Sequence, residues 1–136
     1  MGSVFSSVEL QSLFCAIILG LVQLVLAVLA SLNVRGLPWA AGPRDQPGAP
    51  LGIYGGRLER AWKNFLETFV FFAAAVLLAH ALGKSTANSI LGAQIYLWAR
   101  VLYVPAYVFG IPFVRTLIWA ASLVGILMVL SAIWPG

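Results

Sequence analysis

A run of apolar residues near the start of the chain limits its possible folds more than any other feature. Between positions 13 and 32, only Gln23 and Ser31 interrupt the run with polar side chains. A helix of about 20 apolar residues is long enough to cross the hydrocarbon core of a bilayer. Similar segments follow, and we predict spans over residues 8–34, 57–82, 88–109 and 113–134. The sequence therefore predicts an all-α integral membrane protein, a four-transmembrane-helix bundle that forms one domain over residues 1–136.

The charge content agrees with this class and excludes others. Charged residues make up 9% of the 136 residues, against about 25% in soluble domains. A net charge of +4 could suggest nucleic acid, but the eight Lys and Arg residues are spread over loops and helix ends and form no basic stripe. A single cysteine, Cys15, excludes an internal disulfide and a multi-cysteine metal site. We therefore predict neither a nucleic acid partner nor a metal.

The long loop, residues 35–56, is the second organising feature. Ten of the 21 residues at 36–56 are Gly or Pro, a composition that predicts neither helix nor strand. The side of the membrane with this loop holds most of the basic residues, which are Arg35, Arg44, Arg57, Arg60, Lys63 and Arg115, and the opposite side has Lys84. The positive-inside rule then predicts that the loop is cytoplasmic and that both termini lie outside.

Several polar and small residues predict contacts between helices. Gln23 lies near mid-span and is expected to hydrogen-bond to another helix, and Asn88 can cap the third span. Small pairs that allow close helix approach occur in the first and fourth spans, Ala16 with Gly20 and Ala121 with Gly125. Because Gln23 and Glu67 also need partners, we predict a homotrimer. Residues 1–6 fit a loose myristoylation pattern, which would add little to an integral protein.

The second span begins with the densest charge in the chain and continues as hydrocarbon. At about 100° per residue, one narrow sector of its helix holds polar groups first and apolar ones after them. The polar members are Arg57, Arg60, Asn64 and Glu67, and the apolar ones are Phe71 and Leu78. This pattern predicts a polar seam that enters the membrane.

The third span places Tyr96, Arg100, Tyr103 and Tyr107 on one helical face. An unpaired cation at membrane depth is costly, and Glu67 is the one carboxylate well inside a span, so a pair with Arg100 is sterically plausible. A structural ion pair would explain these two residues alone. The further arginines and tyrosines that collect at the same membrane face favour a binding site for an anion.

Arg115 begins the fourth span, where free N–H groups of a helix already attract anions. The alternative is an interfacial arginine that reaches the headgroups.

Two motifs resemble those of a known family. Arg60-Ala-Trp-Lys-Asn64-Phe-Leu-Glu67 resembles the second-helix signature of the MAPEG superfamily, the membrane-associated proteins in eicosanoid and glutathione metabolism. Arg100-Val-Leu-Tyr103-Val-Pro-Ala-Tyr107 is similar to the third-helix motif of the same family. The chain departs from the common pattern at Trp62, where many members have His or Gln, and at Thr68, where eicosanoid-making members often have Tyr.

The resemblance implies a homotrimer with glutathione bound between subunits as a co-substrate. Carried over by position, the glutathione-binding residues are Arg60, Asn64, Glu67, Arg100, Tyr103 and Tyr107, to which we add Arg57. Arg115 is similar to the catalytic arginine credited with stabilising the thiolate. The resulting hypothesis is a membrane-bound glutathione-dependent transferase or peroxidase acting on hydrophobic electrophiles, small molecules that arrive from membrane lipid.

Two alternatives belong to other classes. One is a non-catalytic protein of the same fold that binds a small anionic or lipophilic ligand. The other is a transporter, which four short spans without paired broken helices disfavour. The loop from Gly36 to Asp45 also resembles a bacterial branch of the family, so we expect a bacterial inner membrane.

Overall fold

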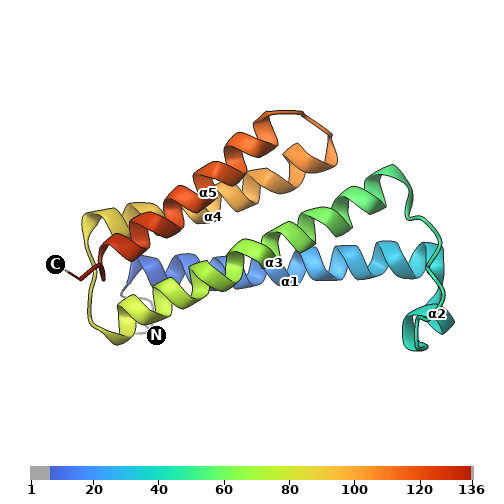
Figure 1. The fold of residues 1–136 in the computed structure, drawn as a ribbon, viewed down its shortest axis with the longest axis horizontal. Helices are drawn as coiled ribbons and strands as arrows, with labels where there is room; N and C mark the ends of the chain where they lie inside the picture. Colours follow the sequence, from blue (N-terminus) through green and yellow to red (C-terminus); the bar gives the residue numbers. More distant parts are fainter. Residues whose placement is uncertain (1–6, 136) are drawn as a thin grey trace.

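The computed structural model describes residues 7–135, and all regular structure in this range is helical. The elements are α1 (Val8–Arg35), α2 (Leu37–Ala41), α3 (Gly52–Ala81), α4 (Ala87–Val108) and α5 (Val114–Ser131). Figure 1 shows an elongated bundle in which α1 lies beside α3 and α4 pairs with α5. The start of α1 and the end of α5 lie at the same end of the bundle. The myristoylation pattern at residues 1–6 lies outside the described residues.

Among the residues that the structure describes, three helices are long and apolar enough to cross a membrane, namely α1, α3 and α5. The remaining long helix, α4, does not reach that hydropathy because it carries Arg100, Gln94 and three tyrosines. A membrane protein is thus supported, whereas the crossing of α4 as a fourth span stays a prediction.

The long helices differ in length, and this difference shapes one end of the molecule. α1 and α3 contain 28 and 30 residues, and α5 contains 18. At 1.5 Å per residue, α1 and α3 are roughly 42 and 45 Å long, while α5 is about 27 Å long. A hydrocarbon core is about 30 Å thick. The end where α2 lies therefore extends past the turn between α4 and α5 (Figure 1).

Glycines and aromatic rings make the closest contacts between helices in the core. A Cβ atom added at Gly125 would lie 2.6 Å from the Gly92 carbonyl oxygen, so α4 and α5 touch through their backbones. Tyr96 is fully buried, stacks on Phe72 with ring centroids 4.0 Å apart, and shares a 3.0 Å hydrogen bond with the Thr68 hydroxyl.

The small residues that were expected to support a trimer pack within the chain instead. Gly125 faces Gly92, and a Cβ atom at Gly20 would lie 2.8 Å from a ring carbon of Phe65. Gln23 is buried, as predicted, but neither amide atom has a hydrogen-bond partner in the described part of the chain. The predicted hydrogen bond of Gln23 to another helix is therefore wrong for a single chain.

The structure corrects two helix boundaries. The long loop was expected to lack helix, but α2 forms within it and α3 begins at Gly52. Pro38 occupies the first turn of α2, where its fixed φ and missing N–H suit a helix start. The cap of α4 is Thr86 and not Asn88. The Ser89 N–H donates to Thr86 Oγ1 over 3.1 Å, and the Thr86 N–H donates to Ser89 Oγ over 2.8 Å.

A buried carboxylate fastens the end of the bundle opposite the loop. Glu9 accepts hydrogen bonds from the hydroxyls of Ser7, Ser85 and Ser89 at 2.7, 2.6 and 2.7 Å. These bonds join the start of α1 to the turn before α4 and to its first residues. The α3–α4 connection is thereby held against α1.

Candidate anion-binding site

The site begins where the first turns of α3 meet the last turn of α4. Arg57 Nη1 donates a 2.9 Å hydrogen bond to the Val108 carbonyl oxygen, one of the last carbonyls of α4, which lacks a helical partner. One turn later on α3, Arg60 Nε donates to the Tyr107 hydroxyl over 3.0 Å. The spacing of these two arginines brings both to the same end of α4.

Tyr107 forms the centre of an alternating set of rings and guanidinium groups. The guanidinium carbon of Arg115 lies 4.8 Å from its ring centroid, and that of Arg60 lies 5.9 Å away. The ring of Tyr103 follows at 5.6 Å. Cations over aromatic faces are attracted by the ring quadrupole, so both guanidinium groups are held beside one tyrosine.

Arg115 reaches this position through an unusual turn. Phe113 precedes α5 with φ of 64°, a conformation that is rare for bulky residues. Arg115 lies in the first turn of α5 and is exposed. The first amide groups of a helix lack carbonyl partners within it, so the backbone adds to the positive potential here.

A cavity of about 170 Å³ opens beside these residues, lined by Asn64, Tyr103, Arg115, Thr116 and Trp119. The Asn64 Oδ1 atom is buried and has no hydrogen-bond partner among residues 7–135. A buried acceptor of this kind is costly unless a donor reaches it. Thr116 and Trp119 were not predicted; Trp119 lies one turn after Arg115 on the same face of α5, and Thr116 is the residue that directly follows Arg115.

Arg100 lies beneath the cavity wall and is 1% exposed. Its guanidinium carbon is 4.2 Å from the Tyr103 ring centroid and 5.8 Å from that of Phe65. Its Nε and Nη1 atoms have no hydrogen-bond partner within the described range. The cation is thus held by ring faces, with donors left over.

The pair of Arg100 with Glu67 that the sequence made plausible does not form within the described residues. Glu67 is exposed, and the ion pairs of the described residues join Glu59 to Arg35 and to Lys63. Phe65 faces Arg100, and a residue two positions later points to nearly the opposite side of a helix. The rotation of α3 that buries Phe65 therefore turns Glu67 outward.

The predicted residues thus divide into groups. Arg60, Asn64, Tyr103, Tyr107 and Arg115 come together at the cavity and its edge. Arg100 packs against the Tyr103 ring, Arg57 closes the end of α4, and Glu67 is exposed, near enough to Arg100 and Tyr103 for its charge to act on them but without an ion pair. Because no carboxylate pairs with Arg60, Arg100 or Arg115 among the described residues, the site has excess positive charge and suits an anion.

Comparison with known proteins agrees with this arrangement. Searches of curated proteins and of solved structures gave no match. A family model described as MAPEG family matches residues 12–134, which include all five helices except the first turn of α1. With a match over nearly its whole length, and with the two motifs meeting at one cationic site, the chain belongs to the MAPEG family.

Proposed function

We propose that the protein is a membrane-bound glutathione-dependent transferase or peroxidase that acts on hydrophobic electrophiles. Membership of the MAPEG family supports a membrane, glutathione-related function. The observation that carries the proposal is the group of three arginines, Arg60, Arg100 and Arg115, around two tyrosines, with no carboxylate within residues 7–135 in an ion pair with them. Such a site is built to receive a charged ligand from outside the chain.

The chain's own groups fit the chemistry of glutathione, which has two carboxylates, an ammonium and a thiol that must lose its proton to attack. Arginines bind carboxylates with two parallel hydrogen bonds, and Arg60 and Arg115 lie at the edge of the cavity beside Tyr107, where a carboxylate can reach them. Arg100 is buried behind Tyr103 and adds positive charge from there. Asn64 offers an acceptor to an N–H donor. Arg115, at the edge of the cavity, would stabilise the thiolate and keep its own proton.

The site of a single chain is too small for the whole ligand. Complete pockets for small molecules measure roughly 300–1,000 Å³, whereas this cavity measures about 170 Å³. We infer that a second copy supplies the rest of the wall, as expected for a homotrimer. Glu67 is exposed on the apolar part of α3, where a carboxylate needs a partner. In the trimer that partner would be the ammonium of glutathione or a polar group of the neighbouring copy.

The orientation in the membrane is also part of the proposal. The loop end of the molecule carries most of the basic residues, and the positive-inside rule places it in the cytoplasm. The cytoplasm holds glutathione, so this orientation gives the site access to its co-substrate. A bacterial inner membrane stays our expectation for the location.

The experiment is ultraviolet difference absorbance on the purified protein with glutathione. We expect a thiolate band at neutral pH, which S-methylglutathione, lacking an ionisable thiol, does not produce. Turnover of chlorodinitrobenzene should accompany the band. Absence of the band despite measurable glutathione binding would contradict the catalytic proposal.

That outcome would favour the second candidate, a non-catalytic member of the family that binds a lipophilic ligand. One observation supports it independently. A groove of about 420 Å³ between α3 and α5 is lined by apolar residues alone, namely Phe71, Ala74, Ala75, Leu78, Leu123, Ile126, Leu127 and Leu130. In the catalytic proposal the same groove would take the hydrophobic electrophile.

A further inference from the structure

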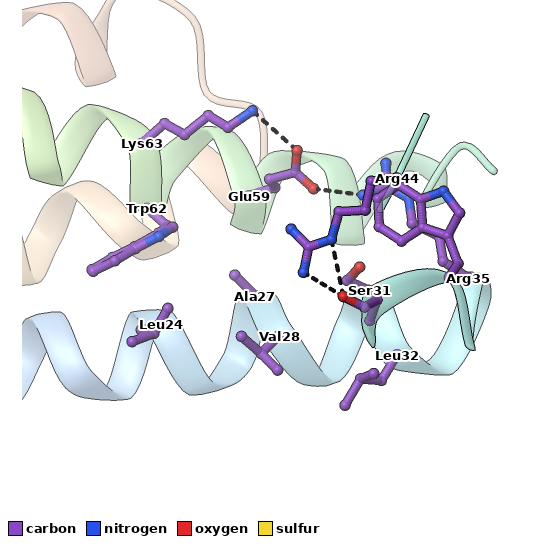
Figure 2. A pocket seen from close by; sticks show the side chains of 12 residues that line it. Leu24, Ala27, Val28, Ser31, Leu32, Arg35, Arg44, Glu59, Trp62 and Lys63 are labelled. Atoms are coloured by element: carbon purple, nitrogen blue, oxygen red, sulfur yellow. Dashed lines mark hydrogen bonds and ion pairs between the residues drawn. The ribbon is translucent and has the colours of Figure 1, made fainter. Parts of the chain in front are cut away.

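A second cationic pocket lies on the other side of α3, apart from the site described above. It has a volume of about 380 Å³ and lies between α1, the region of α2, and α3 (Figure 2). Three cations line it, Arg35, Arg44 and Lys63, together with one carboxylate, that of Glu59. None of these residues belongs to the proposed glutathione site.

The charges of this pocket do not cancel. The carboxylate of Glu59 is shared by Arg35 and Lys63, whose nitrogens lie 3.5 and 3.2 Å from its oxygens. Arg44 has no carboxylate partner in the described residues. Three cations against one anion leave a positive rim, which favours an anionic ligand.

Arg44 is held over the pocket by its own hydrogen bonds. Its backbone has φ of 58°, a left-handed conformation that is unfavourable for residues other than glycine. Its Nε and Nη2 atoms donate to the Ala40 carbonyl oxygen over 3.0 and 2.8 Å. Figure 2 shows the side chain extending above Ser31, and its guanidinium carbon lies 5.3 Å from the Trp39 ring centroid. The loop therefore presents this cation to the pocket.

The other end of the pocket is hydrocarbon. Leu24, Val28 and Leu32 form one stripe of α1 that leads to Arg35, and Trp62 lies across from Leu24 (Figure 2). From Leu24 to Arg35 the helix rises by about 16 Å. Because α1 and α3 extend beyond the α4–α5 turn (Figure 1), the cationic end lies at headgroup depth when the apolar end lies in the acyl region.

We propose that this pocket binds an anionic glycerophospholipid, with its phosphodiester at Arg35, Arg44 and Lys63 and one acyl chain along the stripe of α1. A free phosphate would use only the cationic end and leave the apolar stripe uncovered. A zwitterionic lipid would bring a choline cation toward a rim that is already positive. The cationic end thus favours anionic over zwitterionic lipids, and the apolar stripe favours lipids over soluble anions that have no acyl chain.

Native mass spectrometry of the protein in detergent tests the proposal, with short-chain phosphatidylglycerol and phosphatidylcholine as probes. Phosphatidylglycerol should bind more tightly. A cation near an anionic headgroup contributes about 1 kcal/mol, so Arg44→Gln and Lys63→Gln should each weaken binding by about fivefold, and the double variant by about 25-fold. Lys84→Gln, which removes the same charge at the opposite end of the bundle, should leave binding unchanged. Unchanged thermal melts would show that the variants are folded.

Three results would overturn the proposal. The first is equal binding of the two lipids. The second is displacement of phosphatidylglycerol by glycerophosphoglycerol, the same headgroup without chains, at equal concentration and constant ionic strength. The third is displacement by glutathione, which would make the pocket part of the glutathione site. These three measurements do not depend on whether the protein forms a glutathione thiolate. The lipid proposal and the glutathione proposal can therefore be disproved independently.

Discussion

At the residue scale, Arg115 and Arg100 carry positive charge in different surroundings. Arg115 is exposed at the start of α5 and touches the Tyr107 ring. We expect Arg115→Ala to keep the fold and most of the glutathione affinity. Loss of one preorganised group near a developing charge lowers turnover by roughly 100- to 1,000-fold, and the thiolate band should fall with it. Normal turnover in this variant would make Arg115 an interfacial anchor.

Arg100 is a buried cation that makes no ion pair in the described part of the chain, which costs stability in the free protein. We therefore expect Arg100→Met to raise the free energy of unfolding by about 1 kcal/mol or more and to weaken glutathione binding strongly. Arg57→Met is the matched control. It removes a hydrogen bond to the Val108 carbonyl oxygen and should lower the free energy of unfolding by about 1–3 kcal/mol. Thermal unfolding in detergent with and without glutathione gives both quantities. A destabilised Arg100→Met protein would show that Arg100 serves the fold.

At the element scale, the pairing of α4 with α5 holds Arg115 beside Tyr107. The two helices touch at Gly92 and Gly125, where a Cβ atom would lie 2.6 Å from a backbone oxygen. Gly125→Leu must push the helices apart, and overpacking of this kind typically costs about 1–3 kcal/mol. Turnover should fall even where the protein stays folded, because Arg115 moves with α5. Ala120→Leu, on an exposed position of α5, is the control, and equal effects of the two changes would argue against this packing.

At the scale of the whole molecule, the bundle orientation and the copy number are open to direct measurement. In a Cys15→Ala background, cysteines placed at Asp45 and at Lys84 should be labelled from opposite sides of the membrane, with the Asp45 position reached from the cytoplasm. These positions lie in the loop after α2 and in the α3–α4 turn. Labelling of both from one side would mean that α3 does not cross.

The copy number is tested by native mass spectrometry in mild detergent, where we expect a homotrimer. The physical reasons are the small cavity of a single chain and the exposed Glu67 at membrane depth. Gln23, which is buried without a partner in the described chain, does not lie on an outer surface and gives no support to the trimer. A stable monomer that forms the thiolate would contradict the expectation.

The membrane class, the family and the helical faces shared by most of the candidate site residues could be predicted from the sequence alone. Apolar runs and scarce charge are properties of composition, and helical spacing relates residues on one helix without any knowledge of neighbours. That is why Arg60 and Asn64, or Tyr103 and Tyr107, were placed correctly on shared faces. The same reasoning could have added Trp119, which lies one turn after Arg115 on its face of α5, but not Thr116, which is the next residue along the chain.

Which residues meet across helices could not be predicted in this way, because the rotation of each helix depends on its packing partners. The burial of Phe65 against Arg100 turned Glu67 outward, and the contact of Gly92 with Gly125 used a small-residue pair within the chain. The pocket of Arg35, Arg44 and Lys63 required a loop that folds back onto α1 and a left-handed turn at Arg44. Contacts between residues distant in sequence follow from the packed bundle, and no periodicity along a single helix specifies them.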